Sequence, residues 1–140
     1  YMGAPCIYYG DEIGMDGEHD PGCRKCMEWD EAKQDRELFD FYQKLISLRH
    51  AHPALRAEGT VRFLQARPDG SQLVFERQNE EERILVLFNR SEETAIVELE
   101  AGDEEWTELF GGNHRTAKED GVLAIELPAY GYAVLSTSLT

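Results

Sequence analysis

Carboxylates recur early in the chain at a spacing that raises the question of a metal site. Asp16, Glu18 and Asp20 alternate as the first ligands of a calcium-binding loop do. Such a loop also requires glycine at its sixth position and a bidentate glutamate at its twelfth, and Pro21 and Met27 stand there instead. The sequence therefore does not predict a calcium loop of the EF-hand type.

Two cysteines in the same segment, Cys23 and Cys26, form a single C-x2-C pair. A structural zinc site needs further ligands, for which Cys6 and His19 are the nearby candidates. The two basic residues between the cysteines would lower a thiol pKa, as redox motifs require, but no βαβ pattern follows the pair. We interpret the cysteines as free thiols and expect neither a metal nor a cofactor.

Asp20 and Arg24 carry opposite charges four residues apart. A carboxylate accepts hydrogen bonds and a guanidinium donates them, so the two side chains can hold each other in position. From the residues alone, the simplest interpretation is an exposed salt bridge, worth about 0–1 kcal/mol. Trp29 ends the same segment and is the aromatic residue best placed to stack on a ligand.

These side chains lie in a segment between an expected strand and an expected helix. Residues 4–9 form a short apolar run, typical of a strand buried on both faces, and Gly10 ends it. Residues 11–30 are rich in Asp, Glu and Gly, which predicts a long irregular loop. Asp35 is a suitable N-cap and Pro53 sets the far limit of a helix. Apolar side chains recur between them at steps of three and four: Leu38, Phe41, Tyr42, Leu45 and Leu48.

From residue 59 onward the period of the apolar residues changes to two. Turn signals rich in Gly, Asn, Asp and Pro separate the apolar segments, among them Pro68-Asp69-Gly70. Seven short strands at a spacing of roughly ten residues predict a mainly-β fold, an antiparallel β-sandwich of the Greek-key type. The expected strands are 61–64, 73–78, 84–88, 95–99, 106–110, 122–127 and 132–135.

The two patterns indicate two domains, residues 1–58 and residues 59–140. One strand and one helix leave most of their apolar surface without a partner, so the first part is not expected to be a domain by itself. It is expected to be the last strand–loop–helix unit of a larger barrel. The apolar run follows Tyr1 almost at once, so we expect Tyr1 to lie inside a longer protein.

Composition excludes several partner classes. Lys and Arg number 14 against 28 Asp and Glu, a formal net charge of −14, so nucleic acids and anionic membranes are not expected partners. No run of apolar residues approaches the length of about 20 residues that a membrane-spanning helix needs. Three cysteines and no visible signal peptide favour a cytoplasmic location. Neutral ligands remain compatible with this charge.

Three motifs resemble the α-amylase superfamily of glycoside hydrolases, and the similarity covers the whole chain. Within this superfamily, the sequence most resembles the branch of neopullulanase, cyclomaltodextrinase and maltogenic amylase. The motifs resemble the eighth barrel strand with its loop, the last barrel helix, and the closing strand of the C-terminal sandwich. They are Pro5-Cys6-Ile7-Tyr8-Tyr9-Gly10-Asp11-Glu12-Ile13-Gly14-Met15 with Asp20-Pro21-Gly22-Cys23-Arg24; Arg36-Glu37-Leu38 with Tyr42, Leu45 and Leu48-Arg49; and Pro128-Ala129-Tyr130-Gly131-Tyr132-Ala133-Val134-Leu135.

The resemblance implies a retaining glycosidase that acts on α-glucan oligosaccharides: maltooligosaccharides, cyclodextrins or pullulan, by hydrolysis or transglycosylation. In that family the catalytic Asp, Glu and second Asp belong to barrel strands four, five and seven. The retaining reaction needs two carboxyls about 5–5.5 Å apart. The motifs that carry them do not occur in these 140 residues. We therefore expect no catalytic residue here, no activity from this chain by itself, and partnership with the rest of the barrel.

The resemblance also assigns a role to the loop. Active sites of such barrels lie at the C-terminal ends of the strands, so residues 10–30 would border the substrate cleft. In this family an Asp and an Arg four residues later hydrogen-bond a glucose unit on the non-reducing side of the scissile bond. Asp20 and Arg24 have that spacing and are the expected substrate-binding residues.

Two questions about the isolated segment stay open. The sandwich is either a non-catalytic carbohydrate-binding module or a purely structural domain, and we expect the structural role. The strand at residues 4–9 would expose unpaired backbone groups along its edge, so we expect residues 1–30 either to be poorly ordered or to self-associate with another copy of the chain through that edge.

Overall fold

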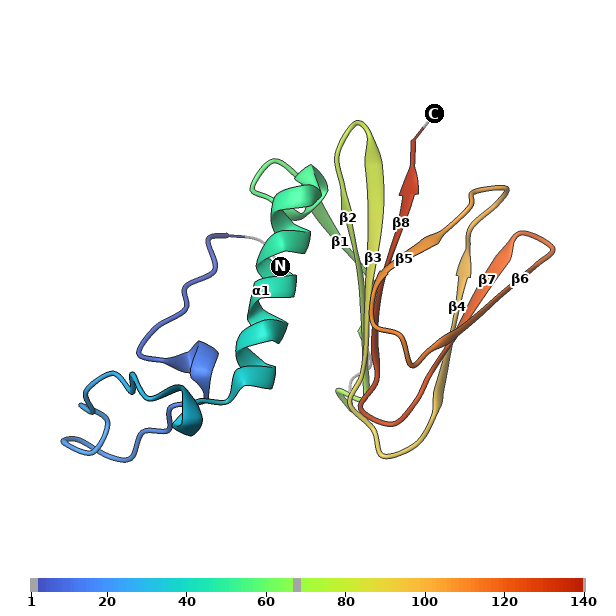
Figure 1. Ribbon diagram of the computed structural model, residues 1–140. Coiled ribbons are helices and arrows are strands. Elements are labelled where there is room, and N and C mark those ends of the chain that lie inside the picture. Colours follow the sequence, from blue (N-terminus) through green and yellow to red (C-terminus); the bar gives the residue numbers. More distant parts are fainter. Residues whose placement is uncertain (1–2, 67–68, 140) are drawn as a thin grey trace. The chain divides into compact units, whose positions relative to one another are not determined.

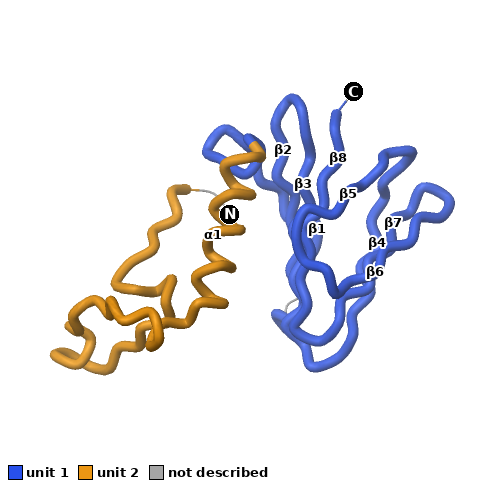
Figure 2. Tube along the Cα trace, in the orientation of Figure 1, with its two compact units in different colours: residues 1–2, 53–140 blue, residues 3–52 orange. Residues whose placement is uncertain are grey.

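The computed structural model describes residues 3–66 and 69–139, so Tyr1 and the predicted turn residue Pro68 lie outside the described residues. Two compact units make up the chain, residues 3–52 and residues 53–140, shown in orange and blue in Figure 2. The unit boundary follows His52, whereas the change in sequence periodicity lies near residue 59. No helix in the described part of the chain is long and apolar enough to cross a membrane.

Residues 4–8 form an extended, exposed segment and not a strand. Ile7 is 40% and Tyr8 69% exposed. The prediction of a buried strand is therefore wrong for this chain. A strand needs a neighbour for its backbone N–H and C=O groups, and none of the β-ladders among the described residues includes this segment.

The helix predicted for this unit is confirmed as α1, Arg36–Ala51. Asp35 caps its first turn, since Oδ1 of Asp35 accepts a hydrogen bond from the Leu38 N–H at 2.9 Å. Two short 3₁₀ helices precede it, Asp11–Ile13 and Glu31–Lys33. The Asp35 N–H donates to the Ile13 carbonyl at 3.0 Å, which fixes the start of α1 to the first 3₁₀ helix.

In the described part of the second unit the chain forms eight strands and a 3₁₀ helix, Pro53–Leu55 (Figure 1). The strands are β1 (Thr60–Ala66), β2 (Gln72–Gln78), β3 (Glu82–Asn89), β4 (Ala95–Glu100), β5 (Thr107–Phe110), β6 (Arg115–Glu119), β7 (Val122–Leu127) and β8 (Tyr132–Ser138).

The strands form two antiparallel sheets, which confirms the mainly-β sandwich. The larger sheet has the order β1-β2-β3-β8-β5 and the smaller one β4-β7-β6. After β3 the chain crosses to the smaller sheet with β4, returns to the larger sheet with β5, crosses again for β6 and β7, and ends in the larger sheet with β8. Strand β8 pairs with both β3 and β5. Strands far apart in the sequence thus become neighbours.

Among the described strands, β6 is the one that the sequence pattern does not predict. All five of its residues are exposed, and it pairs only with β7 at the edge of its sheet. An edge strand that buries no side chain shows no apolar alternation, so its sequence has no signal of period two.

Side chains that alternate along both sheets fill the space between them. The core is formed by Val74, Leu85, Leu87, Val97, Ala101, Leu123, Ile125, Leu127, Ala133 and Leu135. Trp106 packs against this core from the edge. The regular alternation of the apolar residues predicts this core, because inward-facing residues on a strand recur every second position.

Arg77 is a fully buried charge on β2 that binds the connection leading into the sandwich. Its guanidinium donates to the carbonyls of Thr60 at 2.9 Å, Gly59 at 3.0 Å, Leu55 at 3.4 Å and Arg56 at 2.5 Å. Gly59 has no alternative at its position, because a Cβ there would lie 1.9 Å from the Ala54 carbonyl oxygen. This connection is therefore held to the sheet by hydrogen bonds.

Candidate functional site

The segment between Gly10 and Asp30 follows the extended residues and leads into α1. A tight turn lies at its centre, where the Gly22 N–H donates to the His19 carbonyl at 2.7 Å and the Arg24 N–H donates to the Pro21 carbonyl at 3.0 Å. This turn places the side chains of residues 20 and 24 on the same side of the loop, where they meet.

The structure brings the two predicted substrate-binding residues together. Nη2 of Arg24 donates to Oδ2 of Asp20 at 2.5 Å. Both side chains are exposed, Arg24 by 71% and Asp20 by 58%. A guanidinium has five N–H donors and a carboxylate has several lone pairs, so one mutual bond leaves most of this capacity for a ligand.

A second ion pair, which sequence reasoning did not find, closes the same loop. Nζ of Lys25 donates to Oδ1 of Asp16 at 2.5 Å. The hydrogen bond from Lys25, followed by its charge, lowers the pKa of Asp16, and the hydrogen bond to Asp16 raises the pKa of Lys25 against a smaller opposing effect of desolvation. Nine residues separate the partners, so no local periodicity signals the pair.

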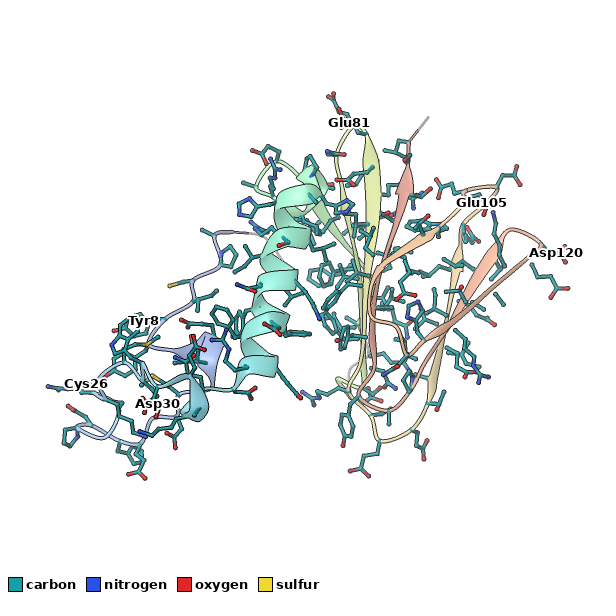
Figure 3. All side chains as sticks on the ribbon, viewed as in Figure 1. Tyr8, Cys26, Asp30, Glu81, Glu105 and Asp120 are labelled. Carbon is teal, nitrogen blue, oxygen red and sulfur yellow. The ribbon has the colours of Figure 1, made fainter. Side chains whose placement is uncertain are left out.

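The three cysteines are free thiols: Cys6 and Cys26 are exposed, and Cys23 is partly buried. Cys26 and Tyr8 are labelled on the loop side of the first unit in Figure 3. Partial burial raises the pKa of Tyr9, and the charges of Cys23, Tyr8 and Cys26 raise it further. Among residues 3–66 and 69–139, no group of three or more His, Cys, Asp or Glu side chains could hold a metal ion.

Trp29 and three aromatic residues of the sandwich differ in how far their rings are exposed. Trp29, at the end of the loop, is 81% exposed and presents its ring to solvent. Trp106 packs on the sandwich core, and Tyr132 stacks on Phe110 at 5.7 Å between ring centroids. Tyr130 is 62% exposed. Only Trp29 among these four belongs to the loop that carries Asp20.

Residues 61–134 match the family model described as the C-terminal domain of maltogenic amylase. The chain belongs to this family. The match begins in β1 and ends in β8, so it covers nearly all of the sandwich.

Relatives of this maltogenic amylase C-terminal domain include enzymes of the expected branch. The chain is 58% identical over 89 residues to a cyclomaltodextrinase of Bacillus sp, covering 64% of the chain and 16% of that protein. It is 39% identical over 138 residues to neopullulanase 2 of Thermoactinomyces vulgaris, covering 96% of the chain and 23% of that protein. The resemblance to the neopullulanase and cyclomaltodextrinase branch of the α-amylase superfamily is thereby confirmed.

A solved structure of a cyclomaltodextrinase has a TM-score of 0.78 and 42% identity to the chain, covering 98% of the chain and 24% of that structure. The similarity therefore includes the loop and α1 as well as the sandwich. The chain spans about a fifth of the length of the curated relatives it matches.

Proposed function

We propose that the whole protein to which this chain belongs is a retaining glycosidase that cleaves or transfers α-glucosyl units of maltooligosaccharides, cyclodextrins or pullulan. The observation that supports this most is the family match over residues 61–134, together with relatives named cyclomaltodextrinase and neopullulanase. In this proposal the 140 residues contribute no catalytic carboxylate, and they act on substrate through the loop of residues 10–30.

Asp20 and Arg24 are the residues proposed to bind substrate. Their bond at 2.5 Å orients both polar groups, and their exposure leaves them accessible to a neutral sugar. The carboxylate would accept hydrogen bonds from glucose hydroxyls and the guanidinium would donate to them. The pair would hold one glucose unit on the non-reducing side of the scissile bond.

The test uses the whole protein and its kcat/KM on maltotriose, maltohexaose, β-cyclodextrin and pullulan. Arg24→Ala removes a charged hydrogen-bond donor, so we expect kcat/KM to fall by about tenfold to a hundredfold. Lys33→Ala is the matched control, since Lys33 is 66% exposed on the same unit and pairs with Glu28 and Asp30 at 3.5–3.7 Å. It should leave kcat/KM unchanged.

Two results would contradict this proposal at different levels. Equal kcat/KM for wild type and Arg24→Ala on every substrate would show that the Asp20–Arg24 pair is a surface salt bridge without a role in substrate binding. A whole protein that releases no sugar from any of the four substrates would contradict the glycosidase itself. The 140-residue chain alone should release no glucose or maltose above a blank.

We also propose that the isolated chain self-associates through residues 4–8. Ile7 and Tyr8 are exposed, and Ile7 lines a hollow of about 570 Å³ together with Met27, Phe39 and Tyr42. Light scattering should show an average mass that rises with concentration for the wild type. At the same concentration the average mass of Ile7→Asp should be lower. Ile96→Asp, on β4, should behave as wild type, and a wild-type monomer at every concentration would contradict the proposal.

A cytoplasmic location remains a proposal, supported by the three free thiols. Alkylation of intact cells with a membrane-permeant and an impermeant maleimide checks it, since only the permeant reagent should label Cys6 and Cys26. Labelling by the impermeant reagent would contradict it.

A further inference from the structure

Three connections meet at one end of the sandwich, below the strands in Figure 1. They join β1 to β2, β3 to β4, and β7 to β8. The Arg90 N–H donates to the Ser71 carbonyl at 2.8 Å, the Tyr130 N–H donates to the Ser91 carbonyl at 3.1 Å, and the Asn89 N–H donates to the Gly131 carbonyl at 2.8 Å. Backbone hydrogen bonds therefore join Ser71 to the β3–β4 connection, and that connection to the one between β7 and β8.

A hollow of about 420 Å³ lies among these connections, within the usual size range of small-molecule sites. Its walls include Leu73, Phe88, Arg90 and Tyr130. Phe88 is 43% and Tyr130 62% exposed, although both belong to a domain whose core already buries a full set of apolar residues. Two accessible aromatic side chains therefore line a single concave site.

Tyr130 is fixed in place in spite of its exposure. Its φ of 55° is in the left-handed region, which a tyrosine rarely adopts. Its hydroxyl donates to Oε1 of Glu92 at 3.3 Å, and the next residue, Gly131, has no room for a Cβ, which would lie 2.7 Å from Cδ of Pro128. A ring held this way loses little conformational freedom when a ligand stacks on it.

The wall beneath the hollow is rigid and already hydrogen-bonded. The Asn89 side chain is buried; its amide donates to the carbonyls of Glu93 and Pro128, each at 2.8 Å, and its Oδ1 accepts from the Ser91 N–H at 3.0 Å. Asn89 therefore shapes the site and is not expected to bind a ligand. The exposed Arg90 supplies hydrogen-bond donors at the rim, where its Nη2 approaches the turn at Gly70.

From this arrangement we propose that the hollow is a second α-glucan site, separate from the loop of Asp20 and Arg24. A glucosyl ring presents apolar C–H faces to Tyr130 and Phe88 and hydroxyls to the guanidinium of Arg90. The chain's net charge of −14 disfavours an anionic ligand, so a neutral sugar fits better than an acidic peptide or a lipid headgroup. The sandwich then has a binding role in addition to the structural one expected from its sequence.

The experiment is a titration of the 140-residue chain with maltoheptaose, followed by amide chemical shifts in two-dimensional NMR. We expect shifts of the residues around the hollow that saturate at millimolar sugar. Tyr130→Ala should weaken binding about tenfold, and Arg90→Ala several-fold. Tyr130→Phe keeps the ring and should retain most of the affinity, which separates stacking from a loss of folding.

Two matched controls locate the binding. Ile96→Ala removes a side chain that is 60% exposed on β4 of the other sheet and should not change the affinity. Trp29→Ala removes the exposed ring at the end of the substrate loop and should leave the saturable shifts around the hollow unchanged. No saturable shifts, or equal affinity for wild type and Tyr130→Ala, would overturn the proposal.

The same titration in the whole protein tests the alternative that another part of that protein fills the hollow. Binding that depends on Tyr130 in both forms supports the sugar site, and its loss in the whole protein overturns it. This outcome is independent of the loop, because Arg24→Ala should leave maltoheptaose binding at the hollow unchanged.

Discussion

The carboxylate of Glu76 on β2 accepts two hydrogen bonds from the guanidinium of Arg83 on β3, at 2.9 Å from Nε and 2.6 Å from Nη2. Glu76 is 2% exposed, and Arg83 also donates to both carboxylate oxygens of Glu104, at 2.6 and 2.7 Å. Burial lowers the pKa of Arg83, but the hydrogen bonds and charges of Glu76 and Glu104 outweigh it and raise that pKa. A paired charge network thus lies within the sandwich.

Replacing Glu76 by Gln should destabilise the sandwich by about 2 kcal/mol, because the buried guanidinium hydrogen bonds lose their charged acceptor. Glu105→Gln, at a side chain that is 94% exposed, should change the free energy of unfolding by less than about 0.5 kcal/mol. Urea unfolding followed by circular dichroism measures both. Equal midpoints for the two variants would show that the buried pair contributes no net stability.

Replacing the buried Arg77 by Lys should cost at least about 2 kcal/mol. A single ammonium group cannot reproduce the planar fork that donates to the carbonyls of Leu55, Arg56, Gly59 and Thr60. Arg62→Lys is the control on the neighbouring strand, where the side chain is 64% exposed. The same urea experiment compares them, and similar losses in both would mean that the fork at Arg77 is dispensable.

The ion pair between Asp16 and Lys25 predicts a pH dependence. The pKa of Asp16 is lowered. The pair therefore stabilises the folded chain at pH values above the ordinary aspartate pKa of about 3.9, and this stabilisation is lost as the pH falls through the lowered pKa. Lys25→Gln should raise the pKa of Asp16 towards the ordinary value. Carboxyl chemical shifts in an NMR pH titration report it. Arg24→Gln should leave the pKa of Asp16 low. If the pKa of Asp16 were the same in Lys25→Gln as in the wild type, the pair would be excluded in solution.

Removing the cap of α1 should destabilise its first turn. Asp35→Ala deletes the acceptor of the Leu38 N–H, at a cost of about 1 kcal/mol, whereas Asp35→Asn retains an acceptor and should cost less. Amide hydrogen exchange at the start of α1 measures this as faster exchange in the alanine variant. Asp40→Ala, at an exposed position within the helix, provides the comparison and should show no such increase. Equal exchange in all variants would contradict a capping role.

The candidate loop site could be read from the sequence only in part. The spacing of Asp20 and Arg24 predicts that they meet, because a turn of the chain brings residues four apart together, and the structure places them at 2.5 Å. The Asp16–Lys25 pair has no such local signal. The hollow at Phe88 and Tyr130 has none either, since it exists only because β3 and β8 pair with Phe88 opposite Tyr132.

The sequence by itself determined the elements whose stability is local. An N-cap with apolar residues at helical spacing is enough to specify α1, and alternation of apolar residues is enough to specify the strands that face the core. Tertiary structure alone decided the exceptions to these local patterns. It left residues 4–8 without a ladder, paired the fully exposed β6 with β7, and buried Arg77 and Glu76. These outcomes depend on neighbours distant in the chain, which no local pattern encodes.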